Sequence, residues 1–180
     1  MILKNGLFEL VRRRRSVRHY GSASIDDATI NEIMKVALMA PTSFGHRPIE
    51  FIVVRNKETI KDIAACKTMG GSQVIGADVV IVVMADVSNK KMSEFWIEDA
   101  AIASSYILLA AEQYGLGACW VHIRNRKGKH TSSDQEIRHL LNVPEGYSVL
   151  NLVALGEKNE FEPAYDEDDI NYSHVHYDSF

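Results

Sequence analysis

Residues 93–120 read "SEFWIEDAAIASSYILLAAEQYGLGACW" and predict a long helix that passes through glycines into a strand. From Ala100 to Ala111 the helix is apolar on almost every side, and Gly115 and Gly117 are typical of a helix C-terminus. Such a helix lies at the centre of a core or in a contact between subunits. Because the apolar run is shorter than the roughly 20 residues that span a bilayer, we predict no membrane segment.

Outside this segment, helices and strands are mixed along the chain. Helices are predicted at 24–40, 57–69 and near 133–144, and strands at 50–54, 78–86, 118–123 and 148–156. Ser24 is the predicted N-cap of the first helix, and Pro41 ends it. The continuously apolar strand at 78–86 is typical of a central strand that is buried on both faces. Because the elements follow no regular βαβ order, the sequence predicts an α+β fold, with a single domain over residues 1–180.

Composition excludes several classes of protein. The chain has 180 residues and a net charge of −4, which argues against a general polyanion binder. Cys66 and Cys119 lie far apart and in no metal-binding spacing, so we predict a soluble protein in a reduced, cytoplasmic setting. His174 and His176 would share one face of an extended segment, but no third ligand is in view, and we predict no metal site.

A run of arginines, "RRRRSVRHY" (12–20), requires an anion or solvent around it. It could be a solvated basic turn, a nucleic-acid surface or a site for a single phosphate. In an extended segment the side chains of Arg14, Ser16 and Arg18 point to the same side, and the planar fork of arginine suits phosphate oxygens. The acidic remainder of the chain argues against nucleic acid.

Two further segments each have a plain and a functional interpretation. The loop "APTSFGHRP" (40–48) is either an ordinary connection from helix to strand or a hydroxyl-rich loop that hydrogen-bonds a polar heterocycle. The segment "GLGACW" (115–120) is either a helix end before a buried aromatic or a place where backbone approaches a flat ligand. Cys119 has no histidine in nucleophile spacing, which favours a buried, inert thiol.

Taken in order, these segments resemble the flavin-dependent nitroreductase family. "RRSVRHY" (14–20) resembles the N-terminal arginine element of the family, and "APTSFGHRPIEF" (40–51) resembles its polar loop. "DAAIASSYILLAAEQYGLGACW" (99–120) resembles its long helix with the following glycine-rich turn. "VHIRNRKGK" (121–129) resembles one short branch of the family, and the similarity covers nearly the whole chain.

The resemblance implies a fold, an assembly and a cofactor. Members of the family have a mostly antiparallel sheet of four or five strands flanked by helices. They form intertwined homodimers that bind one FMN per active site at the subunit interface. By this resemblance the apolar helix has its own sheet on one side and the partner subunit on the other. The C-terminal segment, about 157–180, would be an arm that embraces the partner.

The resemblance also implies a set of cofactor-binding residues. Arg14 and Ser16 would hold the phosphate and ribityl chain of FMN, with Arg15 in the same element, and Arg18 would lie beside the pyrimidine edge of the flavin. The other residues expected at the flavin ring are Pro41, Thr42 and Ser43 of the second subunit, Arg47, Gln73, Gly117, Ala118, Cys119 and Trp120. No catalytic side chain is expected, because the chemistry takes place at flavin N5.

The chain departs from the family pattern in two places. Gly45 and Arg47 stand where relatives often have Asn and Gln, which removes a hydrogen bond and adds a positive charge. Where many relatives supply a basic pair to the phosphate, this chain has the mostly acidic "EKNEFEPAYDEDD" (157–169). Arg124, Arg126 and Lys158 are the candidates to replace that pair.

By resemblance, the activity is an oxidoreductase reaction. NADH or NADPH would reduce FMN, and a small acceptor such as a nitroaromatic or a quinone would then be reduced in the same pocket, in a ping-pong cycle. Two alternatives remain open: a non-enzymatic FMN-binding or sensor protein, and a flavoenzyme of the same fold with other chemistry, such as reductive dehalogenation or flavin cleavage. Neither nucleic acid nor a membrane is an expected partner.

Overall fold

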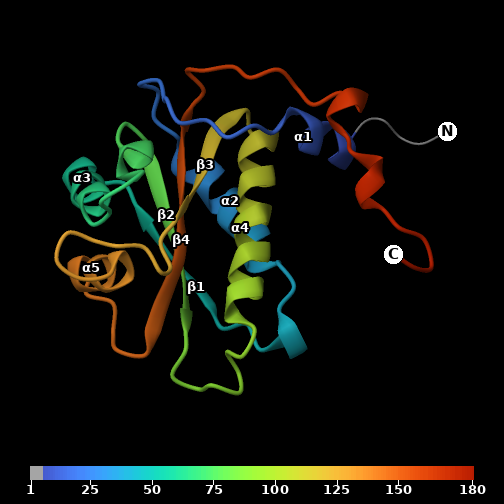
Figure 1. Ribbon diagram of the computed structural model, residues 1–180. Coiled ribbons are helices and arrows are strands. Elements are labelled where there is room, and N and C mark those ends of the chain that lie inside the picture. Colours follow the sequence, from blue (N-terminus) through green and yellow to red (C-terminus); the bar gives the residue numbers. More distant parts are fainter. Residues whose placement is uncertain (1–5) are drawn as a thin grey trace.

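A computed structural model describes residues 6–180 and has four strands in a single antiparallel sheet (Figure 1). The strands are β1 (Ile49–Val54), β2 (Val79–Asp86), β3 (Leu116–His122) and β4 (Tyr147–Glu157), in the order β1-β2-β4-β3. Every neighbouring pair is antiparallel. Strand β2 is buried from Val79 to Ala85, because it lies inside the sheet and helices cover both of its faces. The predicted α+β fold is therefore confirmed.

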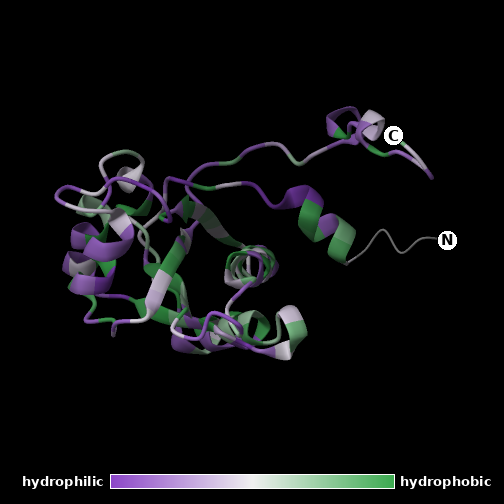
Figure 2. Ribbon diagram, turned by 60° about the horizontal axis from the view of Figure 1, so that its bottom comes forward, coloured by the Kyte–Doolittle hydropathy of each residue, from purple (hydrophilic) through white to green (hydrophobic). Residues whose placement is uncertain are grey.

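Two apolar clusters fill the space between the sheet and the helices on its two faces. On one face of the sheet lie α3 (Lys57–Ala65) and α5 (Ser133–Leu140), and on the other lie α2 (Asp27–Leu38) and α4 (Trp96–Gln113). Figures 1 and 2 show the same division, with α4 seen nearly end-on in Figure 2. Both clusters draw side chains alternately from the same strands, as expected for strands covered on two sides. Among the described residues, no helix combines the length and apolarity that crossing a bilayer requires.

Helix α4 packs on the sheet through small and branched side chains, including Ala100, Ile107 and Ala110. The opposite side of the helix is open, and Ile102 is 37% exposed there. The helix ends at Gln113, and Gly115 reverses the chain with φ of +71°, a conformation that favours glycine. The sequence predicted that Gly117 belongs to the helix end, but in the structure Gly117 lies in β3.

Several predicted helix ends differ from the structure by a few residues, and two of these differences have a clear cause. The N-cap of α2 is Asp26 instead of Ser24, since its carboxylate accepts from Thr29 N at 2.7 Å. Ser24 turns away and donates to Asp78. Helix α3 ends at Ala65 and not at 69, because Thr68 instead hydrogen-bonds Lys127 O in the loop after the third strand.

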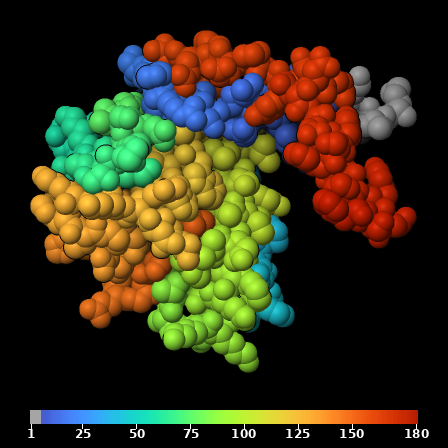
Figure 3. Space-filling model, viewed as in Figure 1, coloured from blue at the N-terminus to red at the C-terminus, as the bar shows by residue number. Residues whose placement is uncertain are grey.

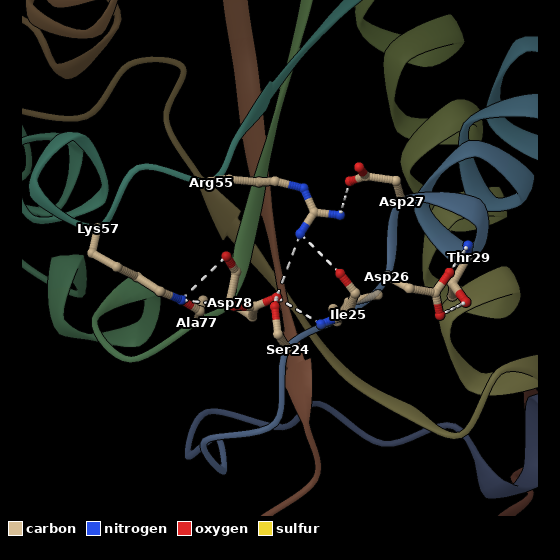
Figure 4. Close-up of polar contacts among 9 residues, drawn as sticks. All are labelled: Ser24, Ile25, Asp26, Asp27, Thr29, Arg55, Lys57, Ala77 and Asp78. Carbon is tan, nitrogen blue, oxygen red and sulfur yellow. Dashed lines mark hydrogen bonds and ion pairs between the residues drawn. The ribbon is translucent and has the colours of Figure 1, made fainter.

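Asp78, just before β2, anchors the segment that leads into α2 (Figure 4). Its carboxylate accepts from Ile25 N at 2.8 Å and from Lys57 Nζ at 2.8 Å, and an Arg55 nitrogen lies 3.7 Å away. Burial favours the neutral acid, but the hydrogen bonds from Lys57 and Ile25 outweigh it and lower the pKa of Asp78. The side chain is only 13% exposed, so these bonds are shielded from water.

Asp78→Asn is expected to lower the free energy of unfolding by about 2 kcal/mol at pH 7, because a shielded acceptor of charged donors is lost. A lowered pKa stabilises the folded state above the unfolded pKa of about 4, and this stabilisation is lost as the pH falls through the folded pKa. Urea unfolding at pH 7 and at pH 3 should show the difference between the two proteins shrinking in acid. Asp27→Asn is the control: the Asp27 side chain is 89% exposed and, among the described residues, pairs with Arg55 alone, so we expect a loss of less than about 0.5 kcal/mol.

The N-terminal and C-terminal segments of the chain run side by side across the top of the sheet. Helix α1 (Leu7–Arg13) leads into an extended segment, and residues 158–180, which we call the arm, leave β4 beside that segment (Figure 1). Asn159 N donates to His19 O, and Tyr165 N donates to Arg12 O. Beyond this contact the arm contains two 3-10 turns, Glu167–Asp169 and Tyr172–His174, and projects from the body of the molecule (Figure 3).

Candidate functional site

The arginine segment lies directly on β3. Val17 N donates to Ala118 O at 3.0 Å, and Ser16 and Ala118 form a parallel bridge. A Cβ on Gly117 would stand 2.6 Å from the Cγ1 of Val17, so only glycine allows this approach. The segments "RRSVR" and "GLGACW", which are about 100 residues apart in the sequence, therefore lie side by side.

Alternate side chains of this segment point to opposite sides. Val17 is buried against the sheet, whereas Arg14, Ser16 and Arg18 line one pocket of about 330 Å³. Within residues 6–180, the Arg14 guanidinium and the Ser16 hydroxyl make no hydrogen bond to protein, and the Arg18 guanidinium donates to Ser16 O at 3.2 Å. The pocket therefore offers a bidentate cation and a hydroxyl that are free to bind an anion.

Two other arginines of the run bind the arm. The Arg15 guanidinium donates to Pro163 O and lies 4.4 Å from the centre of the Tyr165 ring. The Arg12 guanidinium donates to Tyr165 O at 3.2 Å and pairs with Glu9. Arg15, which the family resemblance places among the cofactor residues, thus lines the pocket but holds the arm with its charged end.

Cys119 lies between two groups of positive charge. Burial raises the pKa of its thiol, and the nearby cations Arg18 and Lys67 oppose that effect. Burial also raises the pKa of Cys66, to about 11. Both cysteines are free and buried. A thiol with a raised pKa is a poor nucleophile, which agrees with the interpretation of Cys119 as an inert thiol.

On the other side of Cys119, Gln73 and Trp120 line a second pocket of about 650 Å³. Lys67, His122 and Arg126 belong to the same pocket. Burial lowers the pKa of His122, and the charges of Arg126 and Lys67 lower it further. The sequence-predicted residues Arg14, Ser16, Arg18, Gln73 and Gly117 to Trp120 thus lie along β3, in and between these two pockets.

The loop 41–47 lies at the opposite end of α4. Ser43 donates to the Asp99 carboxylate from its N at 2.8 Å and from its hydroxyl at 3.1 Å. Arg47 N donates to the Thr42 hydroxyl at 3.0 Å, and Arg47 has a φ of +51°. At 1.5 Å per residue, about 20 Å of helix separates Asp99 from the C-terminal end of α4, where the arginine pocket lies. The loop before β1 and the segment after α1 lie at opposite ends of α4 (Figure 1). Pro41, Thr42, Ser43 and Arg47 therefore do not meet Arg14 within one chain.

The three candidates for the missing phosphate ligands lie in different surroundings. Lys158 pairs with buried Glu112 at 2.7 Å. Arg126 lines the second pocket with Lys67, and Arg124 lies near His122. The acidic tail does reach the arginine segment: the Glu160 carboxylate accepts from Arg18 N, and Glu162 lines the pocket of Arg14.

Sequence reasoning missed two residues of this region. Asp99, in the first turn of α4, orders the polar loop. Acidic residues are common in the first turn of any helix because they interact favourably with the helix dipole, so nothing in the sequence singled out Asp99. Lys67 follows α3 and reaches the second pocket through a tertiary contact that leaves no local pattern. Within residues 6–180 no three His, Cys, Asp or Glu side chains gather as metal ligands would.

The sequence pattern of the nitroreductase family matches residues 11–69 and 64–157. The chain belongs to the nitroreductase family. A solved structure of an FMN-dependent nitroreductase from Clostridium difficile R20291 has a TM-score of 0.91 and 39% identity, and the match covers 97% of this chain and 100% of that chain. A protein of Archaeoglobus fulgidus with the provisional name NADH dehydrogenase/NAD(P)H nitroreductase is 33% identical over 170 residues, which are 93% of this chain and 95% of its own length.

A protein of Methanothermobacter thermautotrophicus with the same provisional name is 34% identical over 155 residues, which are 86% of this chain and 78% of its own length. The family resemblance predicted from the four quoted segments is therefore confirmed. In this nitroreductase-family chain, the motif residues occupy two separate places, the end of β3 and the loop before β1.

Proposed function

We propose that this chain is an FMN-dependent oxidoreductase that takes electrons from NADH or NADPH and passes them to a small acceptor, such as a nitroaromatic or a quinone. One observation supports this more than any other: Arg14 and Ser16 offer unpaired donors in a pocket beside the glycine-lined end of β3. The names of the C. difficile and A. fulgidus relatives, an FMN-dependent and an NAD(P)H nitroreductase, agree with the proposal.

The residues present fit the cofactor. A phosphate of FMN at the first pocket would accept the fork of Arg14 and the hydroxyl of Ser16. The ring would extend along Gly117 to Trp120 toward Gln73 in the second pocket. Bound FMN supplies a carrier that accepts a hydride at N5 and releases electrons to the acceptor, which makes a ping-pong cycle possible.

The protein's own residues would position and tune the cofactor. Arg14 and Ser16 bind the phosphate, and the backbone near Gly117 allows close approach of a flat ring. Arg18 places a positive charge beside the ring, which favours negative charge on the reduced flavin. We assign Cys119 no step in the reaction, because burial raises the pKa of its thiol and makes it a poor nucleophile.

A second copy of the chain would complete the site. The loop of Pro41, Thr42 and Ser43 lies about 20 Å from the arginine pocket in one chain, so its expected role at the ring requires the loop of a partner. Exposed apolar side chains on α1, on the open side of α4 and on the arm are available to cover one another in such a dimer. The arm would then embrace the partner.

The absorption spectrum of the purified protein, followed by anaerobic titration with each nicotinamide, tests the proposal. We expect a yellow protein whose visible flavin absorption bleaches with NADH or NADPH and recovers when a nitroaromatic or a quinone is added. A yellow protein that neither nicotinamide reduces would instead be an FMN-binding or sensor protein. A colourless protein that does not take up added FMN would contradict the assignment altogether.

A further inference from the structure

The second pocket, where we propose that the edge of the flavin ring lies, is lined by several positively charged side chains, although that edge is neutral. Its lining includes Lys67, Arg126 and Lys127 together with His122, and no carboxylate is among its lining residues. The chain as a whole has a net charge of −4, so this concentration of cations is a local feature. In the space-filling view the green surface after α3 and the orange surface after β3 adjoin on the visible face (Figure 3).

The backbone holds these cations together. Thr68 donates to Lys127 O from its N at 3.2 Å and from its hydroxyl at 3.0 Å. This contact joins the segment after α3 to the loop after β3, and Lys67 and Lys127 line the same pocket beside it. Asn125, with a φ of +57°, turns the loop so that Arg126 lines the same pocket.

The cations have no acidic partner among residues 6–180. The charged groups of Lys67, Arg126 and Lys127 form no ion pair and no hydrogen bond there. Glu136, the acid of the following helix, accepts instead from His130 N and Thr131 N. Burial and the charge of Arg126 lower the pKa of Lys67, as expected for like charges held close without a counter-ion.

We propose that Lys67 and Arg126 form a subsite for a phosphate or carboxylate group of a substrate, beside the flavin ring. Its position next to Gln73 and Trp120 rests on the proposed function, which places the ring edge there. Two substrates could bring such an anion: the 2′-phosphate of NADPH and an acidic group on the acceptor. In either case the anion removes the repulsion between the two cations and gains charge-assisted hydrogen bonds.

The double variant Lys67→Met and Arg126→Met removes both charges but keeps unbranched, apolar stems. Calorimetry on the flavin-loaded protein would use adenosine 2′,5′-bisphosphate against adenosine 5′-monophosphate, and 4-nitrobenzoate against 4-nitrobenzyl alcohol. We expect the wild-type protein to prefer one of the two anionic probes, and the double variant to lose roughly tenfold in affinity for that probe alone. Lys129→Met, in the same loop but outside the pocket, should bind as the wild-type protein does.

The two pairs of probes identify the source of the anion. A loss confined to the bisphosphate assigns the subsite to NADPH, and the ratio of KM for NADPH to KM for NADH should rise with it. A loss confined to 4-nitrobenzoate assigns the subsite to the acceptor. Unchanged affinity for both anions overturns the inference, and so does loss of FMN from the double variant, since the cations would then belong to the flavin. Because binding is measured without turnover, the result stands even if neither nicotinamide reduces the protein.

Discussion

Arg14→Met is expected to weaken FMN binding about 100-fold, because it removes two charge-assisted hydrogen bonds from the proposed phosphate site. The guanidinium of Arg14 has no partner within residues 6–180, so its loss breaks no contact inside the protein. The variant should therefore unfold at the same temperature as the flavin-free wild-type protein. Fluorescence titration of both flavin-free proteins with FMN measures the difference.

Arg13→Met provides the matched control, since Arg13 is the neighbouring arginine, is exposed and does not line the pocket. It should leave the dissociation constant of FMN within about twofold of the wild-type value. If Arg13→Met weakens FMN binding as much as Arg14→Met does, then the general charge of the segment attracts the phosphate, and the specific role of Arg14 is wrong.

Arg18 should behave differently from Arg14. Its guanidinium already donates to Ser16 O, and its expected place is beside the ring and not at the phosphate. Arg18→Met should therefore lower the reduction potential of the flavin more than it weakens binding, because a positive charge near the reduced ring is lost. A dye-equilibration measurement of the potential separates the two roles. Equal loss of FMN with an unchanged potential in both variants would contradict this division.

Local patterns were sufficient for most elements of the fold. The apolar run of β2 and the glycine that reverses the chain after α4 follow from residues within a few positions of each other. The N-cap of α2 could not be chosen in this way, because Ser24 and Asp26 are both good caps. Asp78 settles the choice by binding the Ser24 hydroxyl and Ile25 N, and Asp78 is more than 50 positions away in the sequence.

The candidate site shows the same limit. The spacing of Arg14, Ser16 and Arg18 predicted a common side for these residues, and the structure places all three in one pocket. That Gly117 makes room for Val17 depends on the way two distant segments cross, which no short pattern records. Lys67 lies in the second pocket next to the contact between Thr68 and Lys127, so its position beside Gln73 depends on a tertiary contact that no local pattern records.

Ile102→Arg is expected to abolish the proposed dimer and FMN binding together. Ile102 lies on the open side of α4, where it is partly exposed in one chain and would be covered by the partner. A two-fold interface contains the substitution twice. If each buried, unpaired charge costs about 2 kcal/mol, the dissociation constant of the dimer rises roughly 1,000-fold.

Light scattering and the flavin spectrum, measured across a dilution series, test this coupling. Loss of the dimer removes the partner's loop of Pro41, Thr42 and Ser43 from the ring, so flavin should dissociate over the same concentration range as the dimer. Ile102→Val keeps the surface apolar and should change neither property, while circular dichroism should show intact helices in both variants. A monomeric Ile102→Arg protein that retains FMN with wild-type affinity would mean that one chain holds the whole site, since nothing from the partner would then be needed to bind the flavin.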